Sequence, residues 1–107
     1  MLKTLFLLIS LLIASPAMAT TYYVATTGND TTGNGSVGNP WLTINKCVQT
    51  SGNPSLAPGD TCSIGDGTYA PASNTVVAIT SAASPNGTSG SPITLKSTNP
   101  LGAIIQV

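Results

Sequence analysis

The first residues that could do chemistry in this 107-residue chain lie in the stretch GNDTTGNGSVGNPW, residues 28–41. Asp30, Thr32 and Asn34 have the spacing of positions 1, 3 and 5 in an EF-hand calcium loop. Such a loop needs a bidentate Glu at position 12, where this chain has Trp41. One carboxylate supplies too few hard ligands, so the sequence predicts no metal site here.

Asp60 and Asp66 form the candidate carboxylate pair for hydrolysis of a glycoside. Both stand in turn sequences, Pro-Gly-Asp-Thr and Gly-Asp-Gly, where Asp ordinarily accepts hydrogen bonds from the local backbone. The chain has no His, which is the usual general base near neutral pH. Lys46 and Lys96 fit solvated helix and strand positions better than the role of a base. We therefore predict no catalytic and no cofactor-binding residue in this chain.

Tyr22 and Tyr23 are the candidate glycan contacts, because an exposed aromatic ring can stack on a sugar ring. They are neighbours in an expected strand, so their side chains point to opposite faces and one of them faces outward if the strand is half-buried. Trp41 is expected in the core. The triplets that begin at Asn29, Asn34 and Asn86 are glycosylation acceptors only in a host that glycosylates exported proteins.

Residues 1–19 have the layout of a secretory signal peptide. Lys3 gives a positive start, residues 5–14 are apolar apart from Ser10, and Ala17-Met18-Ala19 is a cleavage motif. The apolar run is too short to span a bilayer comfortably, although an uncleaved anchor is the alternative. We expect this segment to be removed, and the protein to be secreted, periplasmic or held at the cell surface.

The charges after Ala19 are two lysines and three aspartates, with no Arg, Glu or His, for a net charge of −1. Two cations are too few to form a positively charged surface that would bind nucleic acid or an anionic membrane, so neither is expected as a partner. Short runs of Val, Ile, Leu, Thr and Tyr alternate with clusters of Gly, Pro, Asn and Ser. This pattern is typical of an all-β protein with many turns.

Cys47 and Cys62 are the two cysteines of the chain, and an even count in an exported protein favours a disulfide. The bond would close a loop of about 15 residues and contribute roughly 3 kcal/mol in the chain-entropy model. Two buried thiols or a metal pair are the alternatives, although two cysteines without His make a poor zinc site.

The elements that must position these residues are a short helix and several strands. Asn39 and Pro40 have the residue types of a helix start, and an apolar stripe follows as far as Thr50. Strands are expected over residues 20–26, 61–64, 75–80, 92–97 and 103–107. The chain stops inside the last of these strands, which favours the N-terminal part of a longer protein. A complete small β-sandwich is the alternative.

Several short motifs occur along the chain in an order that resembles the N-terminal part of secreted right-handed parallel β-helix proteins of the pectate-lyase-like superfamily. The matching stretches run from Thr21 to about Ala103. They are Tyr22-Tyr23-Val24, Gly28-Asn29-Asp30, Pro40-Trp41, Thr43-Ile44, and residues 58–61, 67–69 and 90–96.

The resemblance implies an all-β fold in which residues 20–107 form the N-terminal cap and first coils of a right-handed parallel β-helix. The cap would be a helix from about Pro40 to Thr50, pinned to the first strand by a Cys47–Cys62 bond. In polysaccharide lyases of this superfamily, the catalytic Lys or Arg and the calcium-binding carboxylates lie on central coils, which would follow Val107.

We therefore expect the N-terminal part of an exported protein that binds or degrades polysaccharide. A lyase is the enzymatic form that the resemblance implies, with any calcium bound by the later coils. A non-catalytic, adhesin-like β-helix and a small β-sandwich binding module are the alternatives, because a fold does not by itself determine a function.

Overall fold

The computed structural model describes residues 18–48, 56–70 and 87–106. The elements in chain order are β1 (Thr21–Val24), α1 (Ile44–Val48), β2 (Thr61–Ile64), β3 (Gly67–Tyr69), β4 (Thr94–Ser97) and β5 (Ala103–Ile105). These elements are strands apart from one short helix, which is the predicted all-β class. The strand expected over residues 75–80 lies outside the described residues.

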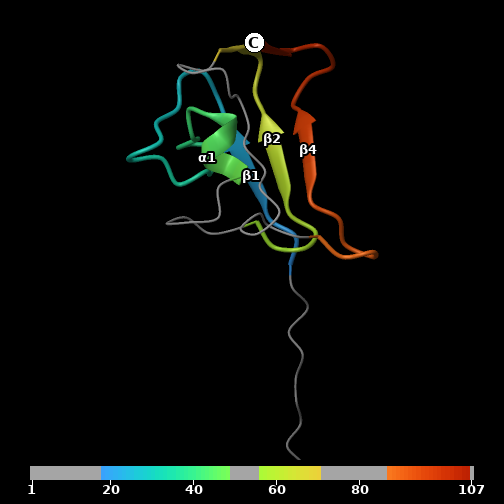
Figure 1. Cartoon of the computed structure of the whole chain (residues 1–107). Helices are drawn as coiled ribbons and strands as arrows, with labels where there is room; N and C mark the ends of the chain where they lie inside the picture. Colours follow the sequence, from blue (N-terminus) through green and yellow to red (C-terminus); the bar gives the residue numbers. More distant parts are fainter. Residues whose placement is uncertain (1–17, 49–55, 71–86, 107) are drawn as a thin grey trace, which may run out of the picture.

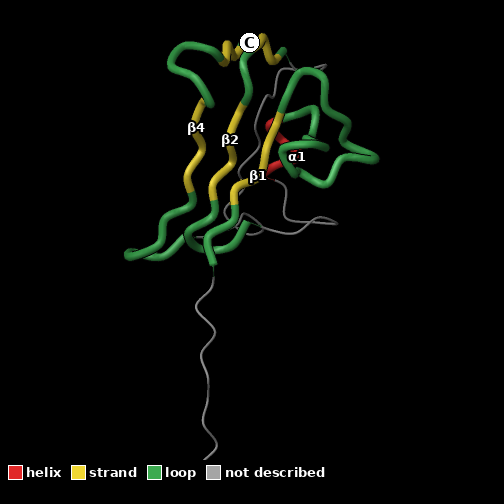
Figure 2. The backbone as a smooth tube through the Cα atoms, turned by 180° about the vertical axis from the view of Figure 1, so that it is seen from behind, coloured by secondary structure: helices red, strands yellow, loops and turns green. Residues whose placement is uncertain are grey.

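Parallel pairing joins all of the described strands. β1, β2 and β4 form a three-stranded sheet in that order, and β3 pairs with β5 in a second sheet. Figure 1 shows β1, β2 and β4 side by side with their arrows pointing the same way, and α1 beside β1. Figure 2 gives the reverse view, with the chain continuing past the ends of β2 and β4 toward its C-terminus.

The chain takes the same path twice. β2 leads through a corner at Gly65 and Asp66 into β3, and β4 leads through a longer corner, residues 98–102, into β5. The two passages lie side by side: the Thr98 N–H donates to the Ile64 carbonyl, and the Gly67 N–H donates to the Gly102 carbonyl, both at 2.8 Å. The two strand–corner–strand units therefore pair along their strands and at both ends of their corners.

The core lies between the three-stranded sheet and α1. Val24 and Ile64 point inward from β1 and β2, as the alternation of side chains along a strand requires. The helix contributes its apolar face, and β3 contributes Tyr69. The buried apolar residues are Val24, Trp41, Ile44, Cys47, Val48, Leu56, Cys62, Ile64 and Tyr69.

The Cys47–Cys62 disulfide joins α1 to β2, with the two Cα atoms 6.4 Å apart. Both cysteines are fully buried. The predicted disulfide is therefore confirmed, and the alternatives of free thiols and a metal pair are excluded. The bond holds the helix against the inner face of the three-stranded sheet.

The helix begins at Ile44, so the predicted start at Pro40 is wrong. Trp41 instead lies alongside β1: its N–H donates to the Tyr23 carbonyl at 3.0 Å, and its carbonyl accepts from the Ala25 N–H at 2.9 Å. This pairing gives both backbone groups of Trp41 a partner at the edge of β1. The predicted helix end at Thr50 lies outside the described residues.

Candidate functional site

The glycine-rich stretch that follows β1 is a folded loop held by its asparagines. The side-chain oxygen of Asn29 accepts from the N–H groups of Thr31 and Thr32, at 2.8 and 3.0 Å. Asn39, which the sequence suggested as the helix cap, instead donates its side-chain amide to the Thr32 carbonyl at 3.0 Å. Asparagine side chains stabilise turns in this way, so the loop is built by local hydrogen bonds.

Asp30 stabilises the start of the helix. One carboxylate oxygen accepts from the N–H groups of Leu42 and Thr43, at 2.8 and 3.0 Å, and the other accepts from the Thr43 hydroxyl at 2.7 Å. The Thr43 hydroxyl in turn accepts from the Lys46 N–H at 3.2 Å, so Thr43 is the N-cap. Negative charge is favourable at a helix N-terminus. The carboxylate of Asp30 thus has a structural role.

Asp60 fastens the beginnings of the three paired strands to one another. Its side chain is only 3 % exposed. One carboxylate oxygen accepts from the Thr20 N–H and the other from the Ala57 N–H, both at 2.7 Å. Its backbone carbonyl accepts from the Thr94 N–H at 3.0 Å. A buried carboxylate is stable when its oxygens are hydrogen-bonded in this way.

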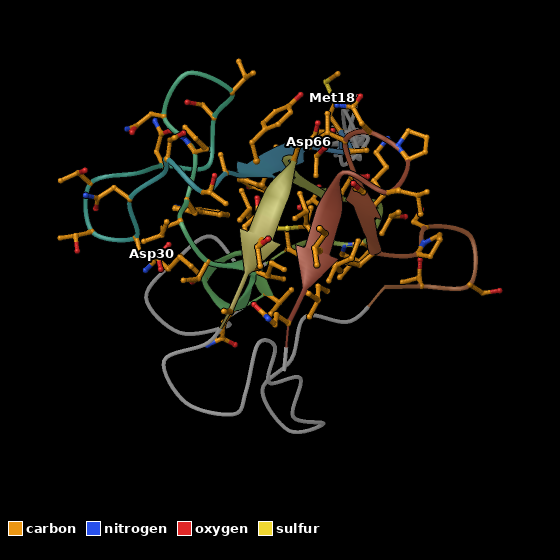
Figure 3. The ribbon with its side chains drawn as sticks, turned by 90° about the horizontal axis from the view of Figure 1, so that it is seen from above. Met18, Asp30 and Asp66 are labelled. Atoms are coloured by element: carbon orange, nitrogen blue, oxygen red, sulfur yellow. A yellow bond between two sulfur atoms is a disulfide. The ribbon has the colours of Figure 1, made fainter. Side chains whose placement is uncertain are left out.

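Asp66 stands at the other end of β2 and joins the two corners. It is exposed, and its carboxylate accepts from the side-chain amide of Asn99 at 2.9 Å. The whole of β2 separates it from Asp60, about 13 Å of strand, whereas paired carboxylates in glycosidases lie at most about 9.5 Å apart. Figure 3 also shows Asp66 well away from Asp30, which lies beside the helix. These aspartates do not form a catalytic pair with one another.

Tyr22 is engaged in packing. Its ring stacks on the indole of Trp41, with the ring centroids 5.3 Å apart and the planes inclined by 16°. The indole N–H donates to the Gly33 carbonyl at 3.0 Å. Gly35 closes the arrangement at a φ of 77°, since a Cβ there would lie 2.8 Å from the indole and 2.9 Å from the Tyr22 ring. This half-buried tyrosine is therefore part of the structure that holds the loop on β1.

Tyr23 points to the opposite side of the sheet, since neighbouring side chains alternate along a strand. Its register partner on β2 is Ser63, whose own partner on β4 is Lys96. Thr21, Thr61 and Thr94 form a second row beside them. We call these six residues the outer face.

The outer face combines a half-buried tyrosine, an exposed lysine and several hydroxyl groups. Strands lie about 4.8 Å apart, so Tyr23 and Lys96 are about 10 Å from each other across the sheet. Ser63 between them is 4 % exposed, and its hydroxyl is hydrogen-bonded to that of Thr98 at 3.0 Å. Sequence reasoning gave Tyr23 as a candidate but missed its alignment with Lys96, because strand register cannot be read from one sequence.

Tyr69, on β3, is bonded to the corner that follows β2. Its hydroxyl donates to the Gly65 carbonyl at 2.8 Å. Burial, and to a lesser extent the negative charge of Asp66, raises the pKa of this phenol above its ordinary value of 10.0. The group is therefore a neutral hydrogen-bond donor at physiological pH.

Residues 18–48, 56–70 and 87–106 contain no group of three or more His, Cys, Asp or Glu placed to hold a metal ion. Within these ranges there is also no helix with the length and apolar character needed to cross a membrane. Comparison with protein-family models, curated proteins and solved structures finds no match to this chain. The outer face is the candidate functional site.

Proposed function

We propose that the described residues begin a right-handed parallel β-helix in an exported protein that binds or degrades polysaccharide. The observation that carries the proposal is the repeated parallel path, in which β4, a corner and β5 lie directly beside β2, a corner and β3. A β-helix is built from such units, each contacting its neighbours. Parallel crossover connections are right-handed in nearly all known sheets.

The parallel pairing also argues against the small β-sandwich alternative. The sheets of immunoglobulin-like sandwiches are antiparallel, whereas the described pairs of strands are parallel. In the proposed β-helix, α1 and its disulfide cover one end of the stack, where the helix packs on β1 and β2.

The opposite side of the stack supports the same proposal. Leu95 is 39 % exposed and Ile105 is 54 % exposed, although their register partners Cys62 and Tyr69 are buried. Among the described residues, no strand pairs with the far edges of β4 and β5. An open sheet edge can pair with a further strand, and a further coil would cover these apolar residues.

The outer face supplies the proposed glycan contact. The Tyr23 ring offers an apolar surface and a phenol, and the threonine hydroxyls both donate and accept hydrogen bonds. Lys96 adds a positive charge, which attracts the carboxylates of an acidic polysaccharide. Tyr22 is the weaker of the two tyrosine candidates, because its ring is stacked on Trp41.

A non-catalytic, adhesin-like β-helix is the second candidate. It agrees with the hydrogen-bonding roles of Asp30, Asp60 and Asp66, which hold the fold together. In the lyase alternative, the catalytic Lys or Arg would belong to coils beyond the described residues. Calcium, if it is used, would be bound there too.

Affinity electrophoresis of the whole chain tests the proposal, with polygalacturonate as the acidic probe and dextran as the neutral one. We expect retardation by polygalacturonate that weakens as salt is raised, and that Tyr23→Ala and Lys96→Gln both reduce. Thr68→Ala, an exposed position on β3, is the matched control and should leave retardation unchanged. Equal retardation of all variants would refute the outer face as the glycan site, and equal retardation by both polymers would refute a preference for acidic polysaccharides.

A further inference from the structure

The amide nitrogen of Thr20 is bonded to a buried carboxylate. Its N–H donates to Asp60 at 2.7 Å, and Asp60 is 3 % exposed. The carbonyl of Thr20 accepts from the Thr61 N–H at 2.9 Å, so the residue is held at both of its backbone groups. Thr20 is nevertheless exposed, and β1 begins one residue later.

The cleavage motif Ala17-Met18-Ala19 ends immediately before this nitrogen. Met18 is 85 % exposed, and neither it nor Ala19 belongs to a strand. A cut after Ala19 therefore frees a backbone nitrogen that already donates to the Asp60 carboxylate. No rearrangement of the sheet is needed, because the strand pairing starts beyond the cut.

We propose that removal of residues 1–19 creates an ion pair between the new α-ammonium group of Thr20 and the carboxylate of Asp60, and that processing thereby locks β1 into the sheet. A peptidase adds water across the peptide bond between the two residues. Ala19 leaves with a new carboxylate, and the nitrogen of Thr20 gains a hydrogen and then a proton from water. The inference rests on the export part of the proposed function and is independent of glycan binding.

The ion pair strengthens a bond that is already present. A hydrogen bond between two ionised groups is roughly twice as strong as one between neutral groups. Asp60 already has backbone N–H partners on both oxygens, so the ammonium group adds charge without displacing them. The exposed position of Thr20 lets the remaining ammonium hydrogens face water.

Other ionisable groups near this point are few among the described residues. β1 carries Tyr22 and Tyr23, and β4 carries Lys96. Lys96 lies two register positions beyond Thr94, whose N–H donates to the Asp60 carbonyl, so it is about 7 Å further along its strand. The α-ammonium group would be the cation in direct contact with Asp60.

The pH dependence of stability follows from this contact. An adjacent carboxylate raises the pKa of the α-amino group above its ordinary value of about 7.7–8.0. A raised pKa in the folded state gives stability that is fully present below about pH 7.7 and is lost as pH rises through the raised value. The processed chain should therefore lose this added stability in mildly alkaline solution.

The experiment compares two exported chains with the same leader. One is the natural sequence, and the other carries Gly-Ser inserted between Ala19 and Thr20, which moves the α-amino group away from Asp60. Mass spectrometry should find a natural N-terminus at Thr20. At pH 6 we expect the natural chain to melt higher by roughly 4–8 °C, the shift that a modest gain in stability gives a domain of this size. Above pH 10 the two melting temperatures should converge.

A second variant, Asp60→Asn, is made in both chains. The natural chain and the Gly-Ser insertion chain should then have equal melting temperatures at pH 6. If that variant does not fold, the pKa of the α-amino group in the natural chain can be measured from the pH dependence of its reductive methylation, and a value above 8 is expected. An uncut or differently cut N-terminus would show that export processing is wrong. A cut at Thr20 with equal melting temperatures, or with an ordinary α-amino pKa, would show that the ion pair is wrong.

Discussion

The ring of Tyr22 lies nearly flat on the indole of Trp41, with 5.3 Å between their centroids, and Gly35 lies against both rings. Tyr22 comes from β1, and Trp41 comes from the far end of the glycine-rich loop. This stacking fastens the two ends of the loop together. The glycine makes it possible, because any larger residue would meet the rings.

Gly35→Ala should therefore destabilise the protein by about 1–3 kcal/mol, since it combines a positive φ with a steric clash. Urea denaturation followed by tryptophan fluorescence would measure the change. Gly38→Ala is the matched control, because no atom lies within 4 Å of a Cβ at that position and its φ is not positive. It should change stability by no more than about 0.5 kcal/mol. Equal effects of the two substitutions would contradict the role of the stacked rings.

Loss of the disulfide should destabilise the chain by about 2–5 kcal/mol, the usual range for a native bond of this kind. Thermal unfolding of the double variant Cys47→Ala, Cys62→Ala would measure the loss. Reductant should lower the melting temperature of the natural chain and leave that of the double variant unchanged. An unchanged melting temperature in the double variant would mean that α1 is held to β2 by packing alone.

Asp30→Ala should remove the carboxylate that holds Leu42 and Thr43 at the start of α1, and cost about 0.5–2 kcal/mol. Because Asp30 acts on Leu42 and Thr43, added calcium or a chelator should leave the melting temperature of the natural chain unchanged. Thr32→Ala, an exposed loop position, serves as the control and should have little effect. Stabilisation by calcium that disappears in Asp30→Ala would instead identify this loop as a metal site.

Tyr69 should make stability fall in strongly alkaline solution. Its pKa is raised in the folded state by burial and by Asp66, so its contribution is fully present below about pH 10 and is lost as pH rises through the raised value. Tyr69→Phe removes the hydroxyl, and with it the bond to Gly65. This variant should be less stable at pH 8 but lose less stability between pH 8 and pH 11, as measured by urea midpoints. Parallel losses in both proteins would contradict the assignment.

The part of this structure that could be predicted from sequence is local. The cysteine pair, the strand at Thr61–Ile64 and the packing of Ile44, Cys47 and Val48 follow from residue type and short-range periodicity. The helix start was misplaced because Trp41 and Ile44 also have the spacing of a helical stripe. β1 is an edge strand of its sheet, and Trp41 pairs with that edge. This pairing could not be seen in the sequence.

The contacts that could not be predicted are long-range. Asp30 reaches Leu42 and Thr43 across the whole loop, and Asp60 reaches back to Thr20. The alignment of Tyr23 with Lys96 depends on the register of three strands. Such pairings depend on how distant segments meet, which a local pattern of residue types does not encode.

The unequal corners indicate where this architecture accepts new sequence. β2 and β3 are joined by two residues and β4 and β5 by five, yet both pairs of strands keep their parallel partners. The longer corner accommodates its extra residues in a turn closed by the Gly102 N–H and the Asn99 carbonyl, with Leu101 at 96 % exposure. A foreign peptide grafted between Pro100 and Leu101 should therefore be displayed on the surface while the sheets beneath it remain intact.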